Sequence, residues 1–292
     1  MTALESIQRS TEFLTKKGVE SPRLQVELAL AHLLKIPRMR LYLDFERQLQ
    51  PSEVAALREM MRRRGQREPL QYILGSMSFC GLELALSPDV FIPRPETELL
   101  AEKGWEFLNA SLAQGASSQT DRTPLALDVG TGSGCLAIAL AFHCPQAEVF
   151  AADLSAAALE LASRNAARHG TDSRIRFLHG DGFAALPEPM RFDLIVSNPP
   201  YIPSAEIAAL PPEVRDHEPR QALDGGADGL DYYRRWASES ASFLRADGRL
   251  MVELGAGQAG RVTEIFQAQK WIVEWVERDY NQHPRILVAH PG

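Results

Sequence analysis

The pattern of apolar and polar positions divides the chain into a helical first part and a longer part of alternating strands and helices. In the first seventy or so residues, apolar side chains recur at helical spacing, for example at Leu24, Leu28, Ala31 and Leu34. Ser21-Pro22 is a typical start for this helix. A later helix begins near Pro51 and ends in Arg62-Arg63-Arg64-Gly65, where cations suit the helix C-terminus and we expect solvated arginines. The pattern predicts a small helical bundle.

Short β-like segments follow between residues 70 and 92. Tyr72-Ile73-Leu74 and Leu82-Glu83-Leu84-Ala85-Leu86 have a β-like pattern, and they lie around Gly75 and Gly81. We interpret them as a β-hairpin that connects two domains.

From Pro93 onward, the pattern predicts one helix and then a regular alternation of strands and helices. The expected strands are 125–129, 147–152, 175–178, 192–197, 250–254, 271–276 and 286–289, and helices are expected at 135–142 and 156–169. This order is typical of a doubly wound α/β fold with a parallel sheet. The stretch 111–122 is rich in Ser, Gln and Gly, so we expect a solvated loop there.

Composition and charge narrow the class of protein. A chain of 292 residues with 45% hydrophobic and 24% charged residues is typical of a soluble globular protein of two domains. No apolar run approaches the roughly 18 residues of a membrane span, and the N-terminus does not resemble a secretion signal, so we expect a cytoplasmic protein. The net charge of −7 disfavours a general nucleic-acid-binding protein.

The cysteines and histidines do not suggest a metal site. The three cysteines have no CxxC spacing, so we expect reduced thiols and no disulfide framework. His143-Cys144 has no second pair of ligands nearby, and we expect no metal.

A glycine loop with a cofactor-binding pattern follows the first expected sheet strand. Its residues are Gly130, Thr131, Gly132, Ser133 and Gly134, and they stand between a strand and a helix. Glycines there allow a ligand to approach the backbone, with N–H groups facing it. Asp153 ends the next strand, 23 positions after Gly130 (153 − 130), where a carboxylate would accept hydrogen bonds from ribose hydroxyls. S-adenosylmethionine and NAD both satisfy this pattern. Asp181, after the third strand, is placed either to approach adenine or to cap a helix.

The tetrapeptide Asn198-Pro199-Pro200-Tyr201 separates these two cofactors. It follows the strand 192–197, at the end of the sheet where open α/β folds bind ligands. Proline lacks a backbone N–H, so the turn offers carbonyl oxygens without competing donors, and the Asn198 side chain adds another acceptor. A planar NH2 group could then be held by both hydrogens, one on the Asn198 side-chain oxygen and one on the Pro199 carbonyl, with Tyr201 beside it. The combination predicts methyl transfer from S-adenosylmethionine to a planar nitrogen.

Over nearly its whole length the chain resembles the HemK-type release factor glutamine methyltransferases, which methylate the Gln side chain in the Gly-Gly-Gln loop of peptide-chain release factors. Besides the glycine loop and Asn198-Pro199-Pro200-Tyr201, the matching pieces are Arg67-Glu68-Pro69-Leu70-Gln71-Tyr72-Ile73-Leu74-Gly75, Phe91-Ile92-Pro93-Arg94-Pro95-Glu96-Thr97-Glu98, Glu218-Pro219, Asp228-Gly229-Leu230 and Val252-Glu253-Leu254-Gly255.

The resemblance implies three parts and a set of site residues. It implies an N-terminal helical domain (1–73) that docks the release factor, a β-hairpin connector (74–92), and a Rossmann-like seven-stranded class I methyltransferase domain (93–292). It also implies that residues around Pro93 help close the cofactor pocket, among them Arg94, Pro95, Glu96 and Thr97. Some relatives place an aromatic residue beside adenine where this chain has Gly182, so Phe183 is a substitute candidate. We expect a monomer that binds release factors and neither nucleic acid nor membranes.

Three alternatives are compatible with parts of this pattern. Adenine-methylating DNA or RNA enzymes share the turn, because an exocyclic amine is also a planar NH2. Ribosomal-protein glutamine methyltransferases resemble the chain in both halves, although the string from Pro93 to Glu98 is more similar to the release factor branch. A binding protein without catalysis would be expected to show decay in the glycine loop or the turn, and neither is decayed. Glu253 stands at the end of a strand, where its side chain either orients the site or caps the strand end. We assign it no catalytic role.

Overall fold

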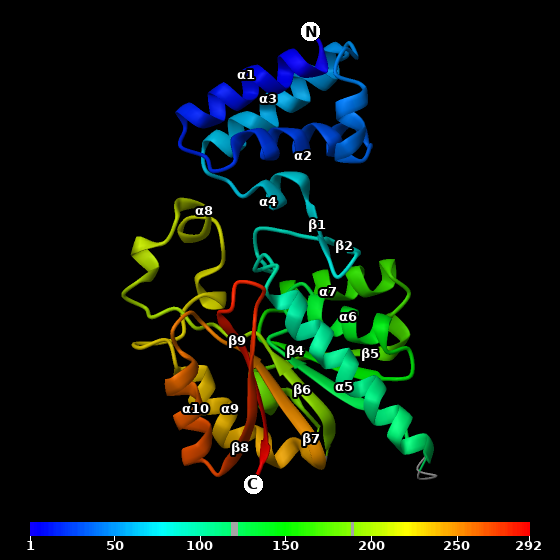
Figure 1. Cartoon of the computed structure of the whole chain (residues 1–292), viewed down its shortest axis with the longest axis vertical. Coiled ribbons are helices and arrows are strands. Elements are labelled where there is room, and N and C mark those ends of the chain that lie inside the picture. Colours follow the sequence, from blue (N-terminus) through cyan, green and yellow to red (C-terminus); the bar gives the residue numbers. More distant parts are fainter. Residues whose placement is uncertain (118–121, 188–189) are drawn as a thin grey trace. The chain divides into compact units, whose positions relative to one another are not determined.

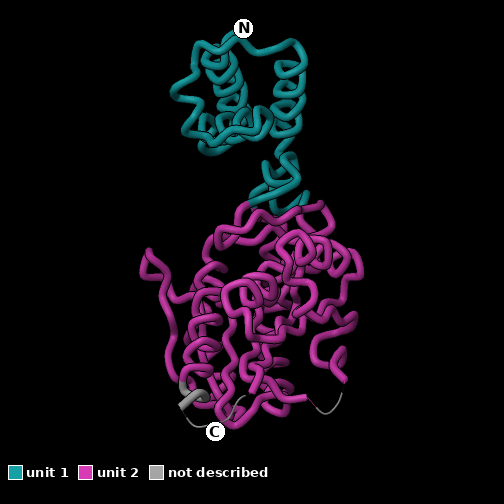
Figure 2. The backbone as a smooth tube through the Cα atoms, turned by 90° about the vertical axis from the view of Figure 1, so that its right-hand side faces the viewer, with its two compact units in different colours: residues 1–77, 211–217 teal, residues 78–210, 218–292 magenta. Residues whose placement is uncertain are grey.

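The computed structural model describes residues 1–117, 122–187 and 190–292 (Figure 1). The chain forms two compact units, which Figure 2 distinguishes by colour. The first consists of Met1–Met77 and Pro211–His217, and the second of Ser78–Leu210 and Glu218–Gly292. The predicted boundaries assign 211–217 to the methyltransferase domain, whereas the contacts group this segment with the first unit. None of the helices in the described part of the chain has the length and apolarity to cross a membrane.

The first unit is helical, as the sequence pattern predicts. Its elements are α1 (Ala3–Lys16), α2 (Pro22–Leu34), η1 (Arg38–Leu43), α3 (Pro51–Gly65), α4 (Leu70–Leu74) and α8 (Pro212–Arg215). A capping box starts α1: the Thr2 side chain accepts a hydrogen bond from Glu5 N, and the Glu5 side chain accepts one from Thr2 N. The predicted strand at 72–74 is wrong, because these residues belong to α4, which ends at Gly75 with a φ of 74°.

The buried face of α2 is not the one that Leu24 and Leu28 mark. Their exposed fractions are 42% and 38%, whereas Val26, Ala29 and Leu30 are fully buried. Both faces of this helix carry apolar residues, so periodicity alone could not choose between them. Two leucines are therefore left at the surface of the first unit.

The expectation of solvated arginines at the end of α3 is wrong for Arg64. Only 4% of Arg64 is exposed. Its Nη2 donates to Glu213 Oε1 at 2.7 Å, and Nη2 of Arg67 donates to Glu213 Oε2 at 2.7 Å. The two arginines thus hold the segment 211–217 in the first unit through Glu213, which lies 149 positions after Arg64 and 146 after Arg67.

The second unit contains the predicted seven-stranded sheet, which is confirmed. Its strands are β3 (Leu125–Val129), β4 (Glu148–Asp153), β5 (Ile175–His179), β6 (Phe192–Ser197), β7 (Leu244–Glu253), β8 (Trp271–Arg278) and β9 (Pro284–Pro291). Their spatial order is β5-β4-β3-β6-β7-β9-β8, and only β9 runs antiparallel to its neighbours. From β3 the strand order runs outward in both directions, through β4 and β5 on one side and through β6 and β7 on the other. Open α/β sheets bind ligands at the carboxyl ends of the two strands where the order divides, which are β3 and β6 here. A separate hairpin pairs β1 (Ser76–Phe79) with β2 (Leu82–Ala85).

Helices cover both faces of this sheet (Figure 1). One face carries α5 (Thr97–Ser117), α6 (Cys135–His143) and α7 (Ala156–Arg168), and the other carries α9 (Asp231–Glu239) and α10 (Ala259–Ala268). An apolar core lies on each face of the sheet. Along β6, Leu194 and Val196 pack into the core shared with α5 and α6, whereas Phe192 and Ile195 pack into the core shared with α9 and α10. The loop expected at 111–122 is helical as far as Ser117, and residues 118–121 lie outside the described residues.

The described part of the second unit also contains the short 3-10 helices η2 (Asp172–Arg174), η3 (Gly182–Ala185), η4 (Ile207–Ala209), η5 (Arg220–Ala222) and η6 (Ser240–Phe243).

Candidate active site

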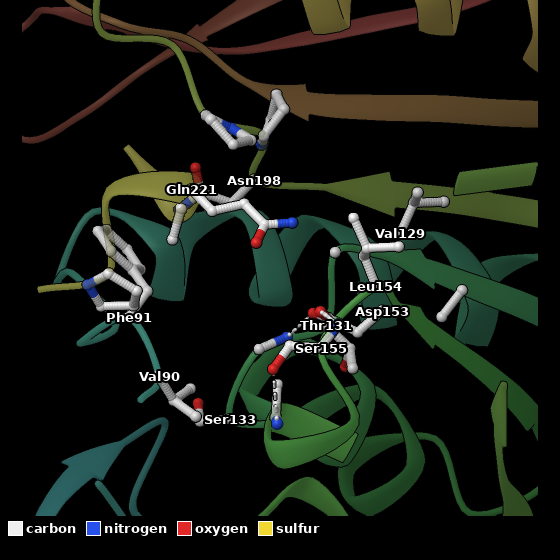
Figure 3. Close-up of a pocket in the computed structure, with 18 of the residues that line it drawn as sticks. Val90, Phe91, Val129, Thr131, Ser133, Asp153, Leu154, Ser155, Asn198 and Gln221 are labelled. Atoms are coloured by element: carbon white, nitrogen blue, oxygen red, sulfur yellow. Dashed lines mark hydrogen bonds between the residues drawn. The ribbon is translucent and has the colours of Figure 1, made fainter. Parts of the chain in front are cut away.

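A pocket opens at the carboxyl ends of β3, β4 and β6. It is lined by the glycine loop, the end of β4, the turn after β6, and the segments 89–93 and 219–222. Asn198 and Gln221 lie on one side of it, and Thr131, Asp153 and Ser155 lie on another (Figure 3). The structure therefore brings together residues that the sequence separates by up to 147 positions (236 − 89).

The glycine loop is held mainly by hydrogen bonds to the end of β4. Gly130, Gly132 and Gly134 have φ values of 77°, 54° and 82°, which favour glycine. N–H groups of the loop donate within the protein: those of Gly130 and Thr131 to Ala152 O, that of Gly132 to Asp153 Oδ2, and that of Gly134 to Thr131 O. The expectation that the loop's N–H groups face the ligand is wrong for these four. The loop is instead a preformed wall.

The carboxyl group of Asp128, a residue of β3, lies at the N-terminus of α6. Its Oδ2 accepts hydrogen bonds from the Thr131 hydroxyl at 2.6 Å and from Ala137 N at 3.1 Å. The carboxyl group is fully buried, and this burial raises its pKa to about 7. A dinucleotide pyrophosphate normally binds at such a helix N-terminus. With a carboxyl group already there, the loop suits a cofactor without phosphates.

Asp153 lies half-buried at the edge of the pocket. Its Oδ2 accepts from Gly132 N and its Oδ1 from Ser155 N, both at 2.8 Å. Each oxygen still has a lone pair, because a carboxylate has about four acceptor positions. This geometry is compatible with the predicted contact to ribose hydroxyls.

We expect Asp153→Ala to weaken binding of S-adenosylmethionine while the protein stays folded. A charge-assisted hydrogen bond contributes about 1.5–3 kcal/mol, so the affinity should fall by roughly one to two decades. Calorimetric titration measures the affinity, and thermal unfolding checks that loss of the Gly132 contact has not unfolded the loop. An unchanged affinity in the folded variant would place the ribose contact elsewhere.

The turn after β6 is fixed by the end of that strand. The hydroxyl of Ser197 donates to Val129 O at 2.7 Å and accepts from Trp236 Nε1 at 3.1 Å, which ties β6 to β3 and α9. Asn198, Pro199 and Pro200 line the pocket.

Tyr201, the last residue of the turn, is not among the residues that line the pocket. Burial raises its pKa above the usual value, and its carbonyl accepts from Gln258 Nε2 at 2.8 Å. Gly225 packs directly on the turn, since a Cβ there would lie 2.8 Å from Pro200 O.

The segment 93–97 contributes unequally to the pocket. Pro93 and Thr97 line it, but Arg94, Pro95 and Glu96 do not. Arg94 instead donates to the buried carboxylate of Glu218 at 2.6 Å and lies over the ring of Phe91, 4.5 Å from its centroid. The pocket contacts expected of Arg94, Pro95 and Glu96 are therefore not seen, and Arg94 acts only indirectly, through its contacts with Phe91 and Glu218.

Gly182 follows β5, and its neighbours are side chains of α9. Asp181 and Gly182 line the pocket, and a Cβ at Gly182 would lie 3.1 Å from both Arg235 and Trp236. Phe183 is buried and stacks on Phe243 at 5.2 Å between ring centroids, outside the pocket lining.

The aromatic side chains at this end of the pocket come instead from α9, where Tyr232 and Trp236 line it. Sequence reasoning missed both of them, together with Val90, Phe91, Leu154 and Gln221. Their positions depend on how distant segments pack against the sheet.

The residues present fit S-adenosylmethionine. The fixed Asp153 carboxylate matches a ribose, the glycine loop with four of its N–H groups already bonded matches a compact cationic chain, and apolar side chains such as Val90, Leu154 and Trp236 match an adenine. Within the described residues, no three His, Cys, Asp or Glu side chains are grouped so that they could hold a metal ion.

Comparison with known proteins gives matches for both parts of the chain. The family model of the PrmC N-terminal domain matches residues 5–75, and that of the methyltransferase small domain matches residues 103–209. The release factor glutamine methyltransferase of Geobacter sulfurreducens is 44% identical over 280 residues, which cover 96% of this chain and 93% of the relative. The enzyme of the same name from Chlorobaculum tepidum is 44% identical over 291 residues, covering 98% and 96%.

Solved structures agree on the fold. The 16S rRNA N2 G1207 methyltransferase of T. thermophilus, solved with AdoMet and guanosine, has a TM-score of 0.50 and 22% identity, covering 74% of this chain and 50% of that chain. At this identity the likeness supports the methyltransferase fold alone.

Proposed function

Because the chain belongs to the family of release factor glutamine methyltransferases, we propose that it methylates the glutamine side chain in the Gly-Gly-Gln motif of peptide-chain release factors and thereby modulates translation termination. The chain is an S-adenosylmethionine-dependent methyltransferase. We further propose that it acts as a monomer in the cytoplasm. The observation that carries the substrate assignment is the turn Asn198-Pro199-Pro200-Tyr201 at the mouth of the cofactor pocket.

The turn is suited to hold a carboxamide by its two N–H bonds. The Asn198 amide nitrogen donates to the Thr97 hydroxyl at 3.0 Å, and no described residue donates to Asn198 Oδ1. That oxygen is available for one hydrogen of a substrate NH2, and the Pro199 carbonyl is proposed to accept the other. Two such contacts orient the nitrogen and favour the positive charge that develops on it.

The cofactor, when bound, supplies an electrophilic methyl group on a positively charged sulfur. The nitrogen of a carboxamide is a poor nucleophile, because its lone pair is delocalised into the carbonyl. Orientation and exclusion of water by the pocket walls must therefore supply most of the rate enhancement. A separate base is not required, since an N-methylated cationic amide is strongly acidic and loses its proton to water.

A nucleic-acid substrate is less compatible with this chain. An exocyclic adenine amine would fit the same two acceptors after base flipping. The net charge of −7, however, does not favour binding to a phosphate backbone.

We propose that the first unit docks the release factor through an apolar patch. The patch comprises Leu24 and Leu28 of α2 and Met39, Tyr42 and Leu43 of η1, which are between 38% and 78% exposed. The two elements are adjacent, since Arg38 and Tyr42 of η1 both donate to Glu27 of α2. Apolar and aromatic side chains of this kind are typical anchors of protein–protein interfaces.

Parallel incubations with labelled S-adenosylmethionine test the substrate class. The acceptors are an intact release factor, a Gly-Gly-Gln peptide, duplex DNA and ribosomal RNA. We expect rapid methylation of the intact factor, slow methylation of the peptide, because it must be ordered on binding and lacks the docking contacts, and none of the nucleic acids. Methylation of adenine at a rate comparable to that of the release factor would contradict the proposal.

A further inference from the structure

A buried carboxyl group lies behind the proposed catalytic turn. Glu253, the last residue of β7, is only 2% exposed. The methyl transfer described above requires no carboxyl group at this place. A buried carboxyl is costly unless its oxygens are hydrogen-bonded, so its contacts indicate what it does.

Glu253 is connected to Asn198 through one hydroxyl group. The Thr97 hydroxyl donates to Glu253 Oε2 at 2.7 Å, and the Asn198 Nδ2 donates to the same hydroxyl at 3.0 Å. Thr97 is 1% exposed, so water does not replace these partners. The two bonds connect the end of β7, the start of α5 and the turn after β6.

The chemistry of these groups gives the connection a direction. An ionised carboxylate only accepts hydrogen bonds, so the single hydrogen of the Thr97 hydroxyl must point to Glu253. The oxygen of Thr97 can then only accept from the Asn198 side chain. The Asn198 amide nitrogen therefore faces Thr97, and its oxygen is turned away from it. The direction follows from the carboxylate and does not depend on how the amide is assigned.

We propose that Glu253 is a positioning residue for methyl transfer: acting through the Thr97 hydroxyl, it holds the Asn198 amide so that Oδ1, and not Nδ2, meets the NH2 group of the substrate. This inference rests on the proposed function, because it requires a substrate that donates hydrogen bonds to Asn198. A reversed amide would present its own NH2 to that of the substrate, and two donors repel one another.

The surroundings of Glu253 make its ionisation sensitive to pH. Burial raises its pKa to about 7, and the hydrogen bond from Thr97 and the nearby charges of Arg285 and Arg94 oppose this increase, whereas Glu96 adds to it. The other titratable groups close enough to interact are Tyr201 and Tyr233, which remain neutral because burial raises both of their pKa values.

The sign of the pH effect follows from the direction of the hydrogen bonds. Below the pKa of Glu253, its protonated carboxyl can donate to Thr97, which frees the Thr97 hydrogen to point to Asn198 and permits the reversed amide. Above the pKa, the carboxylate enforces the productive orientation. Turnover by the wild-type protein should therefore decrease toward acidic pH.

Kinetics of three variants test the inference. Glu253→Gln keeps the shape but accepts and donates equally well, and Thr97→Val removes the hydroxyl, so both should lower kcat about 10- to 100-fold, as losing an orienting group does elsewhere. In Glu253→Gln the cofactor affinity should change little, because Glu253 does not line the pocket, and the acid-side decrease should be lost. Thr97→Ser should keep kcat near the wild-type value. Wild-type kcat in Glu253→Gln or Thr97→Val, or loss of cofactor affinity in step with kcat without recovery in Thr97→Ser, would overturn the proposal.

A measurement without substrate separates this inference from the proposed function. The side-chain NH2 resonances of Asn198, assigned by their absence in Asn198→Ala, should shift with a midpoint near the pH at which Glu253 ionises, and should not shift in Glu253→Gln. Resonances that do not titrate, or that titrate equally in Glu253→Gln, would overturn the positioning role. A wild-type protein that leaves the release factor unmethylated would instead refute the proposed function. The titration of the Asn198 resonances would still show whether Glu253 positions the Asn198 amide.

Discussion

Asn198→Ala should abolish methylation of the release factor while leaving S-adenosylmethionine binding nearly intact. The variant removes Oδ1, to which no described residue donates a hydrogen bond, and it leaves the glycine loop and Asp153 unchanged. Loss of one preorganised polar contact costs on the order of 2–4 kcal/mol of transition-state stabilisation, so kcat should fall by about 30- to 1,000-fold or more. Single-turnover methylation and calorimetric titration of the cofactor measure the two quantities separately.

Asn165 of α7 provides a matched contrast. It is 1% exposed, and its amide donates to Ala85 O and Ser133 O and accepts from Ala85 N. Asn165→Ala should therefore lower the free energy of unfolding and the cofactor affinity, because it loosens the glycine loop. If Asn198→Ala also loses affinity and turnover together, Asn198 is a structural cap and its catalytic assignment is wrong.

The double variant Leu28→Asp, Leu43→Asp should raise the KM for the release factor about 10- to 100-fold, because apolar anchors commonly carry most of the binding energy of an interface. Cofactor affinity and the slow reaction with the Gly-Gly-Gln peptide should be unchanged. Substitution is preferable to deletion of residues 1–73, since Arg64 and Arg67 hold the segment 211–217, which immediately precedes pocket residues Pro219 and Gln221.

Ile272 of β8 offers the control for this experiment. It is 50% exposed, comparable to the two leucines, but belongs to the second unit. Ile272→Asp should leave the KM for the release factor near the wild-type value. Equal KM values for the double variant and the wild-type protein would remove the apolar patch from the docking surface.

The centre of the sheet could be predicted because β3, β4 and β6 are buried on both faces and appear in the sequence as short apolar runs. The pattern of apolar residues predicts the edge strand β8 less well. In β8, Trp271 and Trp275 stand four apart, a spacing that places both side chains on one face of a regular strand, yet Trp271 is 3% and Trp275 43% exposed. A bulge between Val273 and Trp275 shifts the register, and sequence periodicity does not reveal a bulge.

Those parts of the site that directly follow a sheet strand could be predicted from the sequence. The glycine loop, Asp153 and Asn198 each follow a strand directly, so strand order alone brings them to one edge of the sheet. The α9 side chains Tyr232 and Trp236 reach the pocket through tertiary packing, which spacing does not encode. The hydrogen bonds from Asn198 to Glu253 were likewise not visible, because Thr97 lies about a hundred positions before Asn198 (198 − 97 = 101).

Mass spectrometry of a release factor after incubation with this protein and S-adenosylmethionine tests the central claim most directly. We predict one added methyl group, located by fragmentation on the glutamine of the Gly-Gly-Gln motif, and none when Asn198→Ala replaces the wild-type protein. A methyl group on any other residue of the factor, or an unmodified factor in the presence of an enzyme that binds the cofactor, would contradict the account.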